Sequence, residues 1–506
     1  MVSVGDGSNK QRYASLHTKV SQSPIEEATH HTSRGELGTT VASREIQMNF
    51  NLKPYPFQTE AIKFMHEHPR CINGSEMGVG KTIEALKLVQ ELDTQHNLII
   101  CPKTLIAEWF NQVNDILNTD CLTPHTNGNK LNGLDLSGPK FVAVNYDLLA
   151  IPQYWSALND VKWDVIIFDE CHRMKNVKTK RTRAAFLLVP PIPRIIMMSG
   201  TPMQNSPADL FPLFHILNPR LYRSYSAWVK MFCQIALMQV GKRYFNQIVG
   251  VKNTDELNML LHHHMVRHTK QEVLKDLPDK TYRTVPVELG SERKQYGQME
   301  EELFALLDSG ELITAPAVIA QLTRLRQICL DPNLLSHELP RASTPSNKTQ
   351  TLLELIDDTD DKIVVYSYFA RYIELLKQEL DKRDIKNAVI TGQVNTQDRG
   401  RAVHNFQRTT PEECKVFLAT IGAGGEGITL TASHIVVFTD LFWNPAVNWQ
   451  AEDRLHRISQ KNAVLVIDLY CKGTVEEHVH KVVRRKEKMI ESIVTKRVIE
   501  SMRPNV

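Results

Sequence analysis

Residues 75–82 read SEMGVGKT, and the helical stretch IEALKLVQEL (83–92) follows them. Small residues before a Lys-Thr pair at a helix start let backbone N–H groups close around phosphate oxygens, and the helix dipole adds to the attraction. In that geometry Gly78 and Gly80 allow close backbone approach, and Lys81 meets the β and γ phosphates of ATP. Thr82 then places its hydroxyl on Mg²⁺. A G-K-T by itself is a moderate signal, because a plain turn can have the same letters.

A second motif strengthens this interpretation. The apolar run DVIIF (164–168) leads directly into DECH (169–172). A strand that delivers paired carboxylates at its carboxyl end suits metal chemistry, with Asp169 holding Mg²⁺ and Glu170 orienting and deprotonating the attacking water. A lone Asp-Glu pair is usually a solvated turn, but behind a phosphate loop it predicts a site for nucleotide hydrolysis.

Short apolar runs without polar alternation recur along the chain and are separated by helical stretches. Such runs indicate strands buried on both faces of a parallel sheet. They form two clusters, one before residue 205 and one after residue 360, which predicts two α/β domains. The runs are NLIIC (97–101), FVAVN (141–145), DVIIF (164–168), RIIMM (194–198), KIVVYS (362–367), KVFLA (415–419), HIVVF (434–438) and VLVIDLY (464–470).

The rest of the chain divides around these two domains. Residues 1–47 lack a sustained apolar period and predict a disordered tail. We place the first domain at 48–205, a mostly helical insertion at 206–345 and the second domain at 346–475. Residues 476–506 predict a basic C-terminal helix, either packed back on the second domain or facing DNA.

Composition sets broad limits. The 506 residues are 42% hydrophobic and 23% charged, and the net charge of +3 does not by itself indicate a nucleic-acid partner. No stretch approaches the roughly 18 apolar residues that span a membrane, and the N-terminus lacks the apolar core of a secretory signal. The eight cysteines are scattered singly. We therefore expect a soluble protein that is not secreted, with reduced thiols, in the cytoplasm or the nucleus.

With these motifs in place, the chain resembles the helicases of superfamily 2 and, within them, the SNF2 family. LKPYPFQTEAIKFM (52–65) resembles the family's opening motif, which implies that Gln58 reads the adenine. IICPKTLIAEW (99–109) resembles motif Ia, which implies backbone contacts with DNA from Lys103 and Thr104. MSGTPMQNSPADLFPLFHILNP (198–219) resembles the SNF2 form of motif III, whose Ser199, Gly200 and Thr201 would link the ATP site to DNA.

A basic run follows the DECH motif. RMKNVKTKRTR (173–183) holds six basic residues and no acidic residue. Charge runs are usually solvated surface, but beside an ATP site on such a motor this one suggests a strip that tracks phosphates without reading sequence. Its candidate DNA contacts are Arg173, Lys175 and Asn176.

The second domain supplies the other half of the site. QAEDRLHRISQ (450–460) resembles motif VI, with Arg454 and Arg457 three residues apart on one helical face. We expect Arg457 to be the finger that stabilises charge on the transferred phosphoryl group, with Arg454 as a second phosphate ligand or support. TIGAGGEGITLTAS (420–433) resembles motif V, and DLFWNPAVNWQ (440–450) resembles the linking stretch after it. The resemblance implies nucleotide contacts for Gly427 and Gln450 and DNA contacts for Thr420 and Trp443.

The middle of the chain also resembles the SNF2 family, in RHTKQEVLKDLPDK (267–280) and LTRLRQICLDPNLL (322–335). The resemblance therefore covers about residues 52–490. Three positions depart from the usual pattern, namely Ser75, Cys171 and Ser459. None of the three removes a charged catalytic group, so we expect an active ATPase that uses ATP and Mg²⁺.

The resemblance implies a motor that walks on double-stranded or branched DNA as a functional monomer. The short tail and short C-terminal helix leave little room for added modules, which favours branch migration, fork reversal or displacement of bound proteins. Three alternatives stay open: a chromatin-remodelling subunit, a strand-separating DNA or RNA helicase, and an inactive DNA-binding scaffold.

Overall fold

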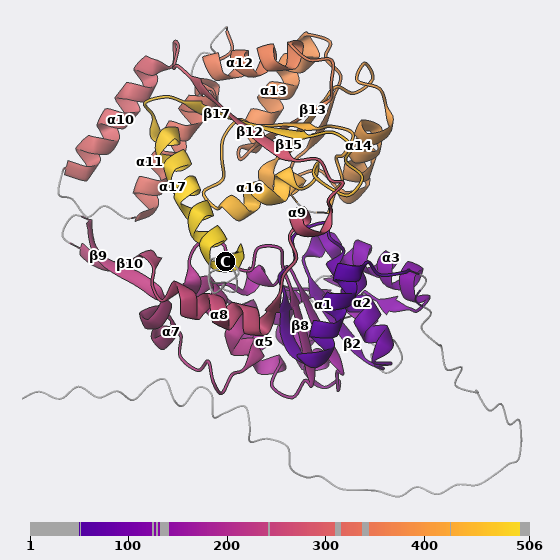
Figure 1. The fold of residues 1–506 in the computed structure, drawn as a ribbon. Coiled ribbons are helices and arrows are strands. Elements are labelled where there is room, and N and C mark those ends of the chain that lie inside the picture. Colours follow the sequence, from indigo (N-terminus) through magenta and orange to yellow (C-terminus); the bar gives the residue numbers. More distant parts are fainter. Residues whose placement is uncertain are drawn as a thin grey trace, which may run out of the picture. The chain divides into compact units, whose positions relative to one another are not determined.

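The computed structural model describes residues 50, 52–123, 126–127, 130–131, 141–240, 243–308, 315–335, 344–425 and 427–495 (Figure 1). The tail predicted at 1–47 therefore lies outside the described residues. Two parallel sheets with surrounding helices occupy the remainder, which confirms the predicted fold class. Within the described ranges, no helix has the length and apolar character that crossing a membrane requires.

The first sheet has the strand order β11-β1-β8-β7-β2-β6-β3, with every pairing parallel. Its strands are β1 (Arg70–Asn73), β2 (Asn97–Cys101), β3 (Cys121–Leu122), β6 (Phe141–Asn145), β7 (Val165–Asp169), β8 (Arg194–Met198) and β11 (Met265–Val266). Its helices are α1 (Pro56–Glu67), α2 (Lys81–Glu91), α3 (Ile106–Leu117), α4 (Pro152–Asn159) and α5 (Lys180–Leu188). A small antiparallel pair, β4 (Thr126–Asn127) and β5 (Lys130–Leu131), lies apart from this sheet.

The second sheet has the order β12-β17-β16-β13-β15-β14, again wholly parallel. Its strands are β12 (Lys280–Val287), β13 (Ile363–Ser367), β14 (Asn387–Ile390), β15 (Val416–Thr420), β16 (Ile435–Phe438) and β17 (Val464–Cys471). Its helices are α12 (Asn347–Asp357), α13 (Ala370–Lys382), α14 (Thr396–Arg408), α15 (Ile421–Gly424), α16 (Pro445–Glu452) and α17 (Val475–Ile490). All eight apolar runs noted in the sequence are strands of these two sheets.

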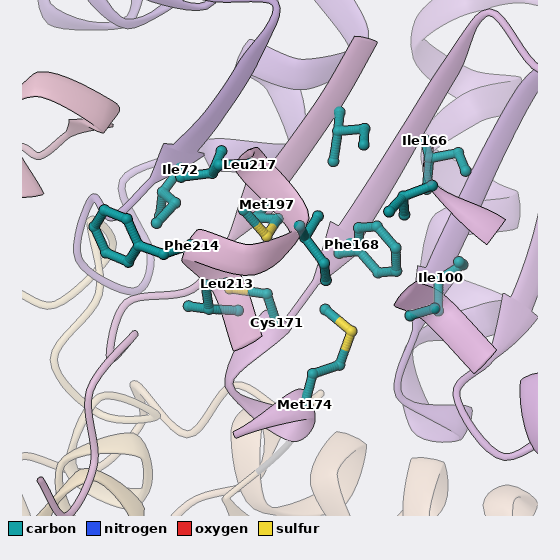
Figure 2. Close-up of a cluster of buried hydrophobic side chains, with 14 of the residues drawn as sticks. Ile72, Ile100, Ile166, Phe168, Cys171, Met174, Met197, Leu213, Phe214 and Leu217 are labelled. Atoms are coloured by element: carbon teal, nitrogen blue, oxygen red, sulfur yellow. The ribbon is translucent and has the colours of Figure 1, made fainter. Parts of the chain in front are cut away.

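Both faces of the first sheet are buried by apolar side chains. Successive strand residues alternate between two buried clusters, so that Ile166 and Phe168 join one and Val165 and Ile167 join the other. Figure 2 shows the first cluster, where strand side chains meet Leu213, Phe214 and Leu217 from α6 (Phe211–Leu217). Each such side chain contributes about 1.5–3 kcal/mol when fully buried, which explains the continuous apolar runs.

The segment predicted as a mostly helical insertion is not purely helical. It contains α6, α7 (Tyr225–Phe232), α8 (Thr254–His264), α9 (Lys270–Val273), α10 (Arg293–Asp308) and α11 (Ala315–Leu330). It also contains the hairpin of β9 (Cys233–Val240) and β10 (Arg243–Val251), and it gives one edge strand to each sheet. The edge strands escaped prediction because β11 has two residues and β12 is largely exposed, so neither makes an apolar run.

The C-terminal helix packs on both domains. Val479 and Val483 of α17 lie in a cluster under the second sheet. Ile490 and the π-helical turn that follows (Glu491–Thr495) reach the first domain, where Ile490, Ile493 and Val494 join its buried cluster. The amide of Asn258 on α8 donates to the carbonyl of Ile493 at 2.8 Å. The helix thus packs on the second domain, and its apolar stripe continues past that core onto the first domain, which was not predicted.

An acid is buried beneath the turn between β1 and α2. The Asn73 side chain donates to the Glu84 carboxyl and accepts from the Ser75 N–H. Glu84 is fully buried, and burial raises the pKa of its carboxyl from 4.5 to about 7. The protonated form is therefore the one that suits the folded chain near neutral pH.

We predict that Ile493→Ala destabilises the first domain by about 3 kcal/mol, because it opens a cavity in a closed core. Ile319 on α11 is 61% exposed, so Ile319→Ala is the matched control with little effect. Thermal unfolding followed by tryptophan fluorescence measures both variants. Equal unfolding midpoints for the two variants would contradict the packing of α17 on the first domain.

We predict that Glu84→Gln removes part of the pH dependence of stability. Because the folded pKa is raised above 4.5, the stabilisation from the bound proton is complete below pH 4.5 and is lost as pH rises through about 7. The variant should match the wild type at pH 5 and exceed it at pH 8, by at most about 3 kcal/mol. Unfolding midpoints at the two pH values measure this. The exposed Glu60→Gln serves as control, and a difference that does not change with pH would refute the assignment.

Candidate functional site

The loop between β1 and α2 gathers four of the predicted nucleotide-binding residues. Gly78 and Gly80 have φ of +83° and +96°, which only glycine adopts without strain. Gln58 is buried, and its Nε2 donates to the Val79 carbonyl at 3.1 Å. A Cβ on Gly80 would lie 2.4 Å from that Nε2, so the loop and the opening motif fit only with glycine there. Lys81 is the first residue of α2, and Thr82 follows it.

The ammonium of Lys81 lies inside this loop. Its Nζ donates to the carbonyls of Ser75 and Glu76 at 2.8 and 2.9 Å. Burial lowers the pKa of Lys81, while the nearby Glu170 and Asp169 carboxylates oppose that shift. The charge therefore faces the two acidic residues of the DECH motif, which stand at the end of β7.

Asp169 is fixed by aromatic residues from two other elements. Its Oδ2 accepts from Trp109 Nε1 of α3 at 2.9 Å, and its backbone carbonyl accepts from the Tyr146 hydroxyl at 2.7 Å. Burial raises the pKa of Asp169, and the adjacent Glu170 adds to the rise. Neither aromatic residue was predicted, because each lies far from the motif in sequence.

Glu170 is linked to the segment after β8. Its backbone has φ +51°, which turns the chain sharply at the end of the strand. Its Oε2 lies 3.2 Å from His172 Nδ1 and 3.4 Å from Ser199 Oγ, and those two groups are 2.9 Å apart. Burial opposes ionisation of Glu170, but the hydrogen bond and charge of His172 outweigh it and lower its pKa. Glu170 is thus held as a carboxylate in contact with the Ser-Gly-Thr segment.

The two arginines of the second domain lie in turns, not on one helical face. Helix α16 ends at Glu452. Beyond it the backbone forms tight turns, in which the N–H of Arg454 donates to the Ala451 carbonyl and the N–H of Leu455 donates to the Glu452 carbonyl. The helical expectation for this stretch was therefore wrong. Arg454 donates to the Gly425 carbonyl at 2.6 Å, and Arg457 donates to Thr429 Oγ1 at 2.5 Å.

Arg457 nevertheless reaches the phosphate loop. A Cβ on Gly78 would lie 3.7 Å from Arg457 Cγ and equally far from Lys270 Cε. Burial lowers the pKa of Arg457 to about 10, and the neighbouring Arg454 adds to the fall, so the guanidinium stays charged at neutral pH. The predicted finger and the predicted loop are thus in contact across the two domains.

A buried ion cluster holds the turn that carries these arginines. Asp453 Oδ1 lies 2.9 Å from the Nζ of both Lys270 and Lys280, which belong to the segment joining the two domains. Lys270 also donates to the His456 carbonyl at 2.7 Å. The two ammonium groups hold the pKa of Asp453 well below its usual range, although its burial works the other way. Sequence reasoning missed both lysines, because single lysines carry no signal.

These residues fit ATP with Mg²⁺. Among the described residues, Arg454 Nε and Thr201 Oγ1 are buried without a hydrogen-bond partner, as polar atoms are when they await a ligand. A lysine, two glycines with positive φ and a helix start make a phosphate cradle. Asp169, Glu170 and the Thr82 hydroxyl are oxygen donors of the type that Mg²⁺ prefers.

A second region brings together four of the seven predicted DNA contacts. Thr104, Arg173, Lys175 and Thr420 line one cavity of about 840 Å³ between the two domains. Gln450, for which a nucleotide contact is predicted, also lines this cavity. The lining also includes Arg181, which belongs to the basic run at 173–183, and Arg399, which was not predicted.

The remaining three predicted DNA contacts lie outside this lining. Lys103 and Asn176 are exposed. Trp443 is half-buried, with the Arg326 guanidinium 5.8 Å from its ring centroid. Gly427, predicted near nucleotide, instead approaches motif Ia, since a Cβ there would lie 3.7 Å from the Thr104 carbonyl.

Gln204 connects the two regions and the two domains. Its Oε1 accepts from Lys175 at 2.5 Å and from Asn444 of the second domain at 2.9 Å. His172 lines the same cavity while its Nδ1 contacts Ser199 and Glu170. Hydrogen bonds and the short DECH segment therefore connect the second domain at the cavity with the Glu170 carboxylate.

Comparison with known proteins agrees with this geometry. A model of the SNF2-related domain matches residues 57–334, and one of the helicase conserved C-terminal domain matches 347–459. The chain is 28% identical over 439 residues to "SWI/SNF-related matrix-associated actin-dependent regulator of chromatin subfamily A-like protein 1" of Xenopus laevis, covering 86% of this chain and 43% of that protein. It is 27% identical over 456 residues to the human "DNA annealing helicase and endonuclease ZRANB3", covering 88% of this chain and 41% of that protein.

The chain thus spans less than half the length of these curated relatives. Among solved structures it is similar to the "Sulfolobus solfataricus SWI2/SNF2 ATPase core in complex with dsDNA", at 24% identity and a TM-score of 0.42 over 88% of this chain and 94% of that one. The SNF2-related model alone covers more than half of the chain. This protein therefore belongs to the SNF2 family of the helicase superfamily and carries both domains of an SNF2-type ATPase.

Proposed function

We propose that this chain is a DNA-stimulated ATPase that translocates on double-stranded DNA and remodels DNA junctions or protein–DNA complexes. The observation that carries the proposal is the approach of the Arg457 side chain to the phosphate loop at Gly78, which supports a hydrolytic site shared by two domains of one chain. An inactive scaffold would need none of Lys81, Glu170 and Arg457. All three are present and partly buried, and Glu170 lies close enough to Lys81 to oppose the fall of its pKa.

The residues of the site divide the chemistry among themselves. Lys81 and the loop N–H groups bind and orient the phosphates, and Arg457 neutralises charge that develops on the transferred group. Glu170 accepts the proton of the attacking water, while His172 and Ser199 hold its carboxylate in place. When bound beside Asp169 and Thr82, Mg²⁺ supplies positive charge to the phosphate oxygens.

Coupling to DNA follows from the cavity between the domains. Thr104, Arg173 and Lys175 offer phosphate contacts from the first domain, and Thr420 offers one from the second. Contacts of this kind read the backbone and not the bases, so binding is sensitive to salt and indifferent to sequence. Alternating grips by the two domains, driven by closure around ATP, then produce steps along the duplex.

A chromatin-related role is a second candidate. The Xenopus laevis relative is named a regulator of chromatin, whereas the human relative is named a DNA annealing helicase. We favour work on branched DNA, in keeping with the name of the human relative, whose match covers 88% of this chain. Nucleosome-dependent turnover that exceeds the turnover on naked forks would favour the chromatin role instead.

The proposal is tested by ATP turnover without nucleic acid and then with duplex, forked, four-way and single-stranded DNA and RNA at fixed salt. We expect strong stimulation by duplex and more by junctions. Lys81→Ala should abolish turnover and leave DNA binding largely intact, because the lysine lies inside the phosphate loop. Stimulation by single strands or RNA alone would replace the translocase with a strand-separating helicase.

We predict that Arg457→Ala lowers kcat by about 10³-fold or more while changing ATP affinity little, because its charge acts mainly in the transition state. The matched control is Arg383→Ala, an exposed arginine paired with Asp357 on the second domain. Turnover and nucleotide affinity are measured separately, with saturating duplex. If kcat is unchanged, Arg457 is not the finger, and Arg454 is tested next.

A further inference from the structure

The segment that contains the hairpin is unusual for this chain because it lacks acidic residues. Residues 210–254 contain no Asp or Glu, although the chain has 57 acidic residues in 506, a frequency that gives about five in such a window. The same segment holds six basic residues, Arg220, Arg223, Lys230, Lys242, Arg243 and Lys252. Arg220, Arg223 and Lys230 are exposed. In its described part this segment therefore exposes basic side chains and no carboxylate, which suits a polyanion.

The hairpin of β9 and β10 extends from this segment as a two-stranded ribbon (Figure 1). Its root is anchored, since Phe232 and Cys233 are buried and Lys252 N donates to the Phe232 carbonyl at 3.0 Å. Arg485 of α17 donates to the Val249 carbonyl at 3.0 Å. The ribbon is thus tied to the first domain and to the helix that spans both domains.

Beyond its root, the ribbon exposes apolar side chains on both faces. Tyr244 is 63% exposed and Leu237 is 65% exposed, and the register places both on one face together with Ile235. Phe245 pairs with Met238 on the other face, and both are exposed. A hairpin without a buried apolar face is only marginally stable by itself. Its exposed apolar side chains are therefore unfavourable in water unless something binds them.

We propose that this hairpin binds the unpaired bases of a DNA junction, with Tyr244 and Phe245 stacking on them. The proposal rests on the function proposed above and names the part of the substrate that this surface recognises. In duplex DNA the faces of the bases are covered by their neighbours, but at a fork or branch the first unpaired bases expose them beside charged phosphates. A ribbon with aromatic side chains and no acid fits that combination, because base–aromatic stacking tolerates any sequence and basic residues track the backbone.

The same chemistry would suit an acidic protein partner less well. Such a partner offers charge, but it does not offer a row of flat apolar faces that matches aromatic residues on both sides of a thin ribbon. Stacking also explains why the ribbon has no covering element among the described residues, since a wedge must enter between bases from both of its faces.

The test is direct binding without nucleotide, measured by fluorescence anisotropy on a forked DNA and on a fully paired duplex of equal length. Double variant Tyr244→Ala/Phe245→Ala should lose about tenfold or more in fork affinity and less than about twofold in duplex affinity. The salt dependence of fork binding should keep its slope, because stacking releases no counterions. A 2-aminopurine at the first unpaired position of the fork should change its fluorescence when the wild-type protein binds, and the double variant should not cause this change.

Two control variants keep the result interpretable. Phe304→Ala removes an aromatic residue that is 56% exposed on α10 and lies outside residues 210–254, and it should change nothing. Tyr244→Trp/Phe245→Trp keeps flat aromatic faces and should retain fork affinity, which separates stacking from any effect on the fold of the hairpin.

Unchanged fork affinity in the alanine variant would overturn the proposal, as would equal losses on fork and duplex. If the wild-type chain self-associates or binds a protein through these residues while the alanine variant keeps its fork affinity, the ribbon is a protein-docking surface and the proposal is wrong. Failure of the translocase function is seen separately, as absence of DNA-stimulated ATP turnover in the wild type, and the anisotropy comparison still decides the role of the hairpin.

Discussion

The ion cluster at Asp453 is the interaction on which the composite site depends. Its carboxylate lies between two lysines from the segment that joins the domains, in a place where water reaches little. A buried charge cluster rarely adds much net stability, because desolvation offsets most of the attraction. Its value here is positional. Removing one partner leaves an uncompensated charge, so the turn that carries Arg454 and Arg457 has one arrangement that satisfies all its neighbours.

The geometry of parallel sheets explains why the rest of the site assembles around that turn. In each domain the functional residues follow the carboxyl ends of strands, as the phosphate loop follows β1 and Asp169 ends β7. The buried strands are stiff, so the positions of these residues vary little. Some connections between the domains are polar, as at Gln204 and Lys270, whereas α17 joins the two cores with apolar side chains. Polar contacts between stiff halves are suited to a cycle of closure and release.

Much of this could be predicted from the sequence, and the gaps have physical causes. Runs of four consecutive apolar residues identified their strands, because a strand buried on both faces leaves no polar positions. Edge strands such as β12 and two-residue strands such as β11 leave no such mark. Loop residues of the site, among them Gly78, Gly80 and Lys81, were predictable because phosphate binding demands particular residue types at fixed spacing. Trp109 and Lys270 act on the site from distant parts of the chain, and spacing carries no information about them.

The course of α17 has a consequence for how the chain is made. Ile490, Ile493 and Val494 complete a core whose other members, such as Ile72 and Phe168, leave the ribosome hundreds of residues earlier. Domains usually fold as units during synthesis, N-terminal first. Here the first domain can collapse early but cannot close its core until the last turns of the final helix have emerged. During that interval an apolar face stays open, and the nascent chain must be shielded by other means.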